Sequence, residues 1–248
     1  DCFVSLYLTL PAITRTNKSV PGSQLRRSFL GRWKPAWLVK WQASTYRLNF
    51  DLHRAGGLWV WLALLIFAWS SVYMNLHDIV YAPVTRQVFD YPPPYWELPK
   101  QETRLKNPAV DWPQAIEIAD RLMAEQSQLH GFSIEKPVGL RLDRARHLYI
   151  YTVRSSRDIQ DRRGRTRLVF DANNGELKQL QLPTGQHSGV TVTMWLNALH
   201  DANVFGLPYR IFVSVLGLLI VMLAMTGIYI WWKKRSARAS SRPLGTVE

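Results

Sequence analysis

Two long runs of the sequence contain no charged residue, and they dominate its hydrophobic pattern. The first run covers Ala55 to Leu76, and the second covers Ile211 to Trp232, where the only strongly polar side chains are Ser214 and Thr226. At about 1.5 Å of rise per residue, helices of this length cross the roughly 30 Å hydrocarbon core of a bilayer. The pattern therefore predicts two transmembrane helices, over 55–76 and 206–232.

The segment between the two runs, residues 77–200, has the pattern of a small α+β domain. A proline-rich linker, residues 91–99, is expected to be stiff and extended. Asp111, followed by Pro113 and Gln114, predicts the capped start of a helix that continues to about Gln126. Period-two alternation then predicts four strands, over Val138–Asp143, His147–Arg154, Arg165–Asp171 and Glu176–Leu182.

The last two strands are separated by Asn173-Asn174-Gly175, which predicts a tight hairpin turn with residues at positive φ. One helix on an antiparallel sheet is the expected architecture of the domain. A domain this small leaves little room for an enclosed active site.

The flanking segments are short and basic. Residues 1–14 contain an apolar stretch too short to span a bilayer, interpreted as the end of a transmembrane helix that begins upstream. Residues 15–54 are predicted to be a basic cytoplasmic loop with an interfacial helix, because three tryptophans recur every four residues and would share one helical face: Trp33, Trp37 and Trp41. Residues 233–248 are expected to be a basic cytoplasmic tail.

The distribution of charge predicts the orientation in the membrane. Residues 15–54 contain nine Lys or Arg and one acid, Asp51, and residues 233–248 contain five bases before the last acid, Glu248. In residues 77–200, sixteen bases are nearly balanced by fourteen acids. The positive-inside rule therefore places both flanks in the cytoplasm and the central domain outside it.

Several classes of function are disfavoured by the sequence. The net charge of +13 follows from the basic membrane flanks, and no nucleic-acid recognition motif accompanies it. The sequence contains no GxGxxG or P-loop motif for a nucleotide. The single cysteine, Cys2, cannot form a disulfide within the chain.

Three of the six histidines lie near the predicted membrane boundaries. His53 precedes the first run on the cytoplasmic side, whereas His77 and His200 lie at the outer ends of the first and second runs. About 36 Å of helix separates His53 from His77, so these two cannot share one metal ion. The other three are interpreted as surface or turn residues: His130, His147 and His187.

Histidine at a membrane helix has two interpretations. It can be a polar residue that anchors the helix end, or it can bind a haem iron between facing helices. Gly56 and Gly57, one turn beyond His53, leave space that suits either a porphyrin or a neighbouring helix. The residues alone leave both interpretations open.

Three stretches together resemble one protein family. They are NFDLHRAGGLWVWLALLIFAWSSVYMNL, the FDANNGEL hairpin with the Leu-His that follows it, and FGLPYRIFVSVLGLLIVMLAMTGIYIWWKKR. Together they are similar to the PepSY-associated transmembrane helix family of bacterial inner-membrane proteins, over about Arg26 to Arg238. The resemblance implies four spans in two repeated halves, of which this chain matches the second, with a periplasmic PepSY-like domain between its spans.

The resemblance also implies a function. Some members of the family are haem-containing reductases that act on ferric siderophores during iron uptake. On this pattern His53 and His200 would each be an axial ligand of a different haem b, with His77 as an alternative outer ligand. The opposite ligands would come from the upstream half or a second copy. The family often has His-Thr-Gly where this chain has His200-Asp201-Ala202.

Two functions are therefore expected from the sequence. The first is electron transfer through haem across the inner membrane, from a quinol or a cytoplasmic donor to ferric iron or a ferric siderophore. The second is a non-catalytic membrane protein whose PepSY domain binds or restrains an exported partner such as a peptidase. Haem content distinguishes the two, and both require the lipid bilayer as a partner.

Overall fold

The chain folds into two compact units. The computed structural model describes residues 2–11 and 28–240. Asp1–Ala68 and Ile211–Glu248 belong to the first, here called the helical unit, and Trp69–Arg210 form the second, the sheet unit. Parts of the predicted segments 1–14, 15–54 and 233–248 lie outside the described residues.

A four-stranded antiparallel sheet forms the centre of the sheet unit. Its strands are β1 (Ile134–Asp143), β2 (Leu148–Ser155), β3 (Thr166–Asp171) and β4 (Leu177–Gln181), and they lie in sequence order. The predicted strands are confirmed, although β1 begins four residues earlier than expected. Among the predicted turn residues only Gly175 has a positive φ, of 74°, so one of the three carries the left-handed conformation.

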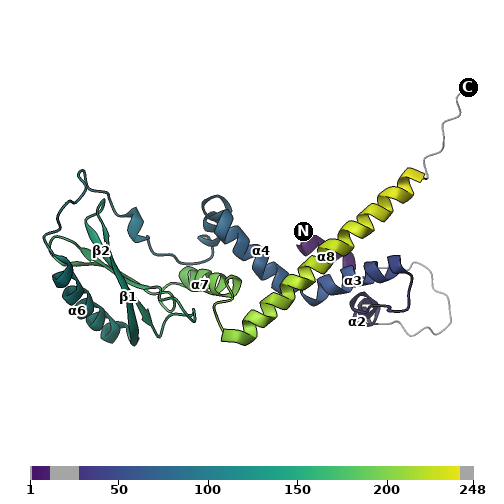
Figure 1. Cartoon of the computed structure of the whole chain (residues 1–248), viewed down its shortest axis with the longest axis horizontal. Helices are drawn as coiled ribbons and strands as arrows, with labels where there is room; N and C mark the ends of the chain where they lie inside the picture. The colour runs from purple at the N-terminus through teal and green to yellow at the C-terminus, as the bar shows by residue number, and fades with distance from the viewer. Residues whose placement is uncertain (1, 12–27, 241–248) are drawn as a thin grey trace, which may run out of the picture. The chain divides into compact units, whose positions relative to one another are not determined.

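The predicted helix of this unit is α6 (Trp112–His130), which runs beside the sheet (Figure 1). Its start is the predicted capping box, in which the Asp111 carboxylate accepts from the Gln114 N–H at 2.9 Å. Its end is Gly131 in the left-handed conformation. Ala115, Ala119 and Met123 are buried against aromatic and aliphatic residues of the sheet.

The opposite face of the sheet is covered by the proline-rich segment. Tyr95, in the short 3-10 helix η3 (Tyr95–Glu97), is buried against three strand residues: Leu148, Ile150 and Val169. The Gln179 side chain donates to the Pro93 carbonyl at 2.8 Å. The predicted linker is therefore a packed part of the sheet unit.

Besides η3, three helical elements of the sheet unit were not predicted. They are the π-helical turn η2 (His77–Tyr81), the short helix α5 (Ala82–Thr85) and α7 (Ser188–His200). Helix α7 follows the loop that contains His187, and its residue Gly189 packs on the ring of Tyr91, where a Cβ atom would lie 2.3 Å away. A glycine is required there for this contact.

The helical unit contains α1 (Cys2–Thr9), α2 (Phe29–Trp33), the 3-10 helix η1 (Lys34–Trp37), α3 (Thr45–Trp59) and most of α4 (Trp61–Asn75) and α8 (Gly206–Ser240). The predicted interfacial helix with three tryptophans on one face is wrong. Pro35 interrupts the helical pattern, Leu38 is extended, and Trp41 lies in a turn. Only Trp33 and Trp37 meet, with ring centroids 5.1 Å apart.

The two predicted spans have different structures. Among the described residues, one continuous helix, Gly206–Arg238, is long and apolar enough to cross a membrane. The first predicted span, 55–76, covers the end of α3 and the whole of α4. These two helices are bent by 68° at Val60, and only as a pair are they long and apolar enough to cross a membrane. The straight helix assumed between His53 and His77 is therefore not formed. Paired glycines in the turn before Val60 are a common cause of such a bend.

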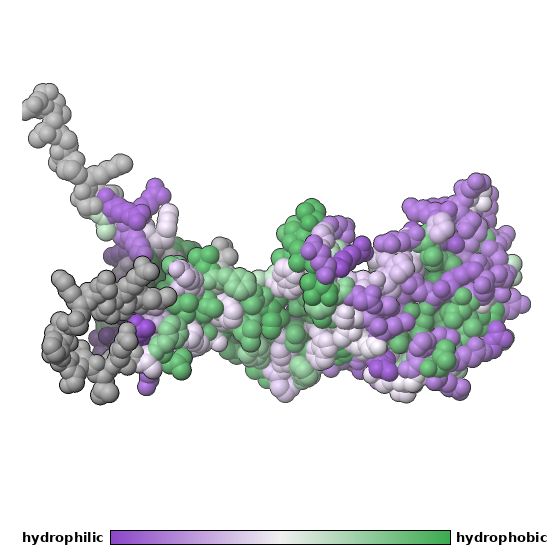
Figure 2. Space-filling view, turned by 180° about the vertical axis from the view of Figure 1, so that it is seen from behind, coloured by the Kyte–Doolittle hydropathy of each residue, from purple (hydrophilic) through white to green (hydrophobic). Residues whose placement is uncertain are grey.

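The surface of α8 agrees with a membrane environment. Large apolar side chains along it are exposed, including Leu218, Met225 and Ile228, and Figure 2 shows hydrophobic side chains along the visible face of the helical unit. The visible face of the sheet unit is largely hydrophilic (Figure 2). Helix α8 continues through Lys233, so the start of the predicted basic tail is helical.

Candidate functional site

His53 is held in a defined orientation by α8. Its Nδ1 lies 3.0 Å from the Leu223 carbonyl oxygen and 3.1 Å from Thr226 Oγ1. A carbonyl oxygen only accepts, so Nδ1 carries the proton, and in the neutral imidazole Nε2 keeps its lone pair. The Thr226 hydroxyl donates to the Met222 carbonyl at 2.8 Å, which leaves its own lone pairs for His53. This is the arrangement of a metal-binding histidine.

Glycines permit this close approach of α3 and α8. A Cβ atom on Gly227 would lie 3.2 Å from Cε1 of His53, and one on Gly56 would lie 2.9 Å from Cε of Met222. A Cβ atom added to Gly57 would have no described atom within 4 Å, apart from the backbone of its own helix. Gly56 is thus explained by helix packing, whereas Gly57 faces open space.

That open space is a cavity of about 400 Å³ beside His53, within the helical unit. Its walls come from α1, α3, α4 and α8, and most are apolar or aromatic: Leu6, Leu8, Phe50, Leu58, Trp61, Leu64 and Leu223. Within the described part of the chain, Arg54 is the one Lys or Arg in the lining. A haem could be accommodated by this combination of an imidazole nitrogen with a free lone pair, apolar walls and a guanidinium group.

Asp51, one turn before the cavity, has a structural role. Its carboxylate is fully buried and accepts from Arg54 at 2.9 Å and from Arg47 at 3.3 Å. Arg54 also donates to the carbonyls of Pro35 at 2.9 Å and Ala36 at 3.1 Å. These contacts fasten the segment before α3 to the helix that carries His53.

His200 is the last residue of α7 in the sheet unit. Its Nδ1 lies 2.7 Å from Oγ of Ser70, whose side chain is fully buried. A hydroxyl can donate or accept, so this contact does not identify the protonated nitrogen. Ala202, two residues later, has a φ of 49°, in the left-handed region.

His77 has the contacts of an oriented histidine. Its Nδ1 lies 2.6 Å from the Asp78 carboxylate, and its ring stacks on Tyr81 with centroids 5.9 Å apart. A carboxylate on Nδ1 directs Nε2 away from it. His77 lines a second cavity, in the sheet unit, together with Arg86, Arg165 and Arg167.

The remaining histidines lie on loops or helix ends. His130 is exposed at the end of α6, and the His147 side chain contacts the Thr103 carbonyl at 2.8 Å. His187 is less peripheral than expected, because it pairs with Asp90 at 2.5 Å and lines the second cavity. Neither that cavity nor its arginines were predicted, because their segments are distant in the sequence.

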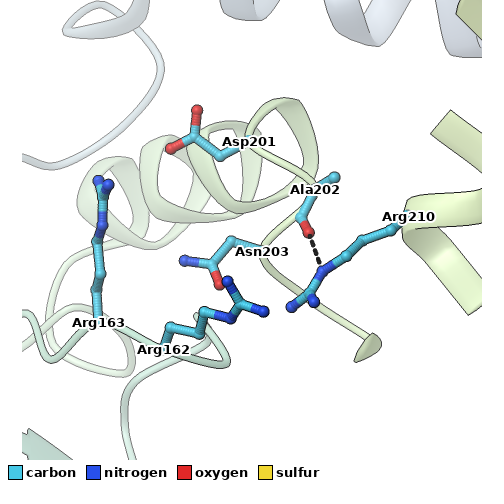
Figure 3. A pocket seen from close by; sticks show the side chains of 6 residues that line it. All are labelled: Arg162, Arg163, Asp201, Ala202, Asn203 and Arg210. Carbon is cyan, nitrogen blue, oxygen red and sulfur yellow. Dashed lines mark hydrogen bonds between the residues drawn. The ribbon is translucent and has the colours of Figure 1, made fainter. Parts of the chain in front are cut away.

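A third hollow lies beside the connection from α7 to α8 and is lined by Arg162, Arg163 and Arg210 (Figure 3). The Arg210 Nε donates to the Ala202 carbonyl at 3.4 Å. Asp161 fixes the connection at two points, since its N–H donates to Asn203 O and its carboxylate accepts from the Gly206 N–H, each at 2.9 Å. The contacts around this hollow hold the helix connection.

Within residues 2–11 and 28–240, no group of three or more His, Cys, Asp or Glu side chains is arranged to hold a metal ion. The fold defines a class of membrane-associated protein in which apolar helices are joined to a helix-and-sheet domain. A family model described as the PepSY-associated TM region matches residues 18–234, and the chain belongs to this family. A comparison with curated proteins gives no match.

Proposed function

We propose that this chain takes part in haem-dependent electron transfer at the bacterial inner membrane, reducing ferric iron or a ferric siderophore on the periplasmic side during iron uptake. The observation that supports this proposal most is the hydrogen bond from His53 Nδ1 to the Leu223 carbonyl, 3.0 Å long. It leaves Nε2 beside an apolar cavity, as an axial ligand requires.

The residues around His53 would each contribute to binding. Leu223 and Thr226 fix the rotation of the imidazole ring, and Gly227 lets the ring approach α8. Gly57 leaves the cavity open, and Arg54, while paired with Asp51, adds a polar group to its lining. A haem bound there would supply one-electron chemistry at its iron.

The outer ligand is proposed to be His200, with His77 as the alternative. His200 is oriented by Ser70, and His77 is oriented by Asp78. Each proposed site still needs a second axial ligand, from the upstream half or from a second copy of the chain. In this proposal the sheet unit is periplasmic, both basic flanks are cytoplasmic, and a quinol or a cytoplasmic protein is the electron donor.

The test is a pair of spectroscopic measurements on the detergent-purified full-length protein. A dithionite-reduced minus oxidised visible spectrum is expected to show b-type haem bands, diminished in His53→Ala and in His200→Ala but not in His130→Ala. A ferric chelate added anaerobically to the reduced protein is expected to reoxidise those bands. Absence of haem would contradict the proposal and favour a non-catalytic protein that binds an exported partner.

A further inference from the structure

The second cavity lies within the sheet unit and has an unusual lining. It has a volume of about 200 Å³ and is formed by the proline-rich segment, the start of β3 and the first turns of α7. Among the described residues, its lining contains three arginines and two histidines but no Asp or Glu. Cationic side chains around a cavity with no acidic residue in its lining indicate an anionic ligand.

Two of these arginines lie close together in the sequence, one directly before β3 and one within it. Arg165 immediately precedes β3, Arg167 is its second residue, and both are only partly exposed. Among the described residues neither forms an ion pair with a carboxylate. Burial, and then the neighbouring charge of Arg165, lower the pKa of Arg167. The Arg167 guanidinium is therefore in an environment that an anion would stabilise.

The third arginine, Arg86, is more exposed and has a distant acidic neighbour. Its guanidinium lies 3.9 Å from the Glu97 carboxylate, and both side chains are more than half exposed. An exposed pair at this distance contributes little. Arg86 can thus turn toward a bound anion at low cost. A guanidinium group has a fork of N–H donors that matches two oxygen atoms of one anion.

Aromatic rings form part of the remaining lining of the cavity. Tyr91 and Trp96 lie on either side of the prolines of the connecting segment, and both line the cavity. The ring of Tyr91 packs on Gly189, and its hydroxyl lies 3.3 Å from Thr193 Oγ1. Trp96 is 53% exposed. Aromatic rings that line the same cavity as guanidinium groups suit a ligand that is itself aromatic.

We infer that this cavity binds an anionic ligand that carries an aromatic ring. On the proposed function, on which this identification rests, the ferric complex to be reduced is a negatively charged chelate with aromatic chelating groups, such as a catecholate. A cavity of about 200 Å³ accommodates one ring of such a chelate. The remaining part of the complex would stay outside the cavity.

The experiment measures binding with complexes that cannot be reduced. Isothermal titration calorimetry on the detergent-purified full-length protein would use the trianionic gallium(III) tris(catecholate) and the neutral gallium(III) tris(acetohydroxamate). The catecholate complex is expected to bind at least about tenfold more tightly than the hydroxamate complex. Arg167→Gln and Arg165→Gln are each expected to weaken catecholate binding about tenfold or more, as expected for loss of a charged hydrogen bond.

The control variant is Arg163→Gln, which removes an exposed arginine two residues before Arg165 and outside this cavity. It is expected to bind like the wild type. Trp96→Leu keeps the charge and is expected to weaken binding severalfold. Arg167→Lys keeps the positive charge but loses the paired N–H donors of the guanidinium group, so it should bind with intermediate affinity. This variant also shows whether loss of binding in Arg167→Gln reflects misfolding.

Equal binding of the two gallium complexes, or unchanged catecholate binding in both Arg165→Gln and Arg167→Gln, would overturn the inference. Gallium is not reduced, so the titration does not depend on haem. Catecholate binding by a protein without haem would contradict the proposed function alone and support the cavity as an anion site. Haem that is reoxidised by a ferric chelate, without arginine-dependent binding, would overturn the inference alone.

Discussion

The imidazole of His53 and the carbonyl of Leu223 are joined by a 3.0 Å hydrogen bond, although 170 residues separate them in the sequence. This bond links α3 to α8 and determines which ring nitrogen carries the proton. The Nε2 of His53 is left for another partner.

Replacing Gly227 by alanine tests the packing of His53 on α8. The added Cβ would lie 3.2 Å from Cε1 of the imidazole, so the ring has to shift. Overpacking of this kind costs about 1–3 kcal/mol, and we expect haem affinity to fall about tenfold. A haem titration followed by the Soret absorbance measures this affinity.

Gly217→Ala is the matched control on the same helix. No atom lies within 4 Å of the corresponding Cβ position. We expect unchanged haem affinity and an increase in stability of at most about 1 kcal/mol, because alanine is the better helix former. An equal loss of haem in both variants would show that the contact with His53 is not responsible.

Filling the cavity at Gly57 tests whether that space is needed. The position is open, so Gly57→Ala should fold and bind haem like the wild type, whereas Gly57→Leu should occupy part of the 400 Å³ space. We expect a large loss of haem in Gly57→Leu with little change in the thermal unfolding midpoint. The pyridine haemochrome assay quantifies the haem. Full haem content in Gly57→Leu would place the cofactor elsewhere.

Ala202→Gly is expected to stabilise the sheet unit. Ala202 has a φ of 49°, a left-handed conformation that costs an alanine about 1–2 kcal/mol and a glycine little. Greater freedom of glycine in the unfolded chain offsets part of the gain, which leaves up to about 1 kcal/mol. The thermal unfolding midpoint in detergent shows whether the stability rises as expected. Ala198→Gly, in the buried interior of α7, should instead destabilise, and stabilisation by both would contradict this explanation.

Reporter fusions test the proposed topology. Alkaline phosphatase fused after Pro183 should be active, because the sheet unit is proposed to be periplasmic. The same reporter fused after Arg238 should be inactive, and a fluorescent protein fused there should be bright. The reverse pattern would exclude ferric reduction on the periplasmic side by this unit.

The helix-and-sheet domain was predictable because its signals are local. Asp111 and Gln114 specify the start of α6 through neighbouring backbone groups, and alternation specifies each strand from its own residues. The spans were predictable only in part. Composition identified the apolar run from Ala55 to Leu76, but it did not indicate the 68° bend at Val60 that divides the run between two helices.

The candidate sites were predictable to a smaller extent. His53 was identified from its place before an apolar run, but its partner Leu223 lies on another helix, and no local pattern relates them. The contact between Ser70 and His200 spans 130 residues in the same way. Arg86, Arg165 and Arg167 resemble ordinary surface residues in the sequence, and only folding brings them to one cavity.

The most direct test of the central claim, that His53 Nε2 is an axial haem ligand, is chemical rescue of His53→Gly. The visible spectrum of the purified variant would be recorded with and without imidazole. We predict loss of the haem bound next to α3 and its recovery when imidazole enters the space left by the side chain. Haem retained in His53→Gly without imidazole, with unchanged absorption bands, would contradict the claim.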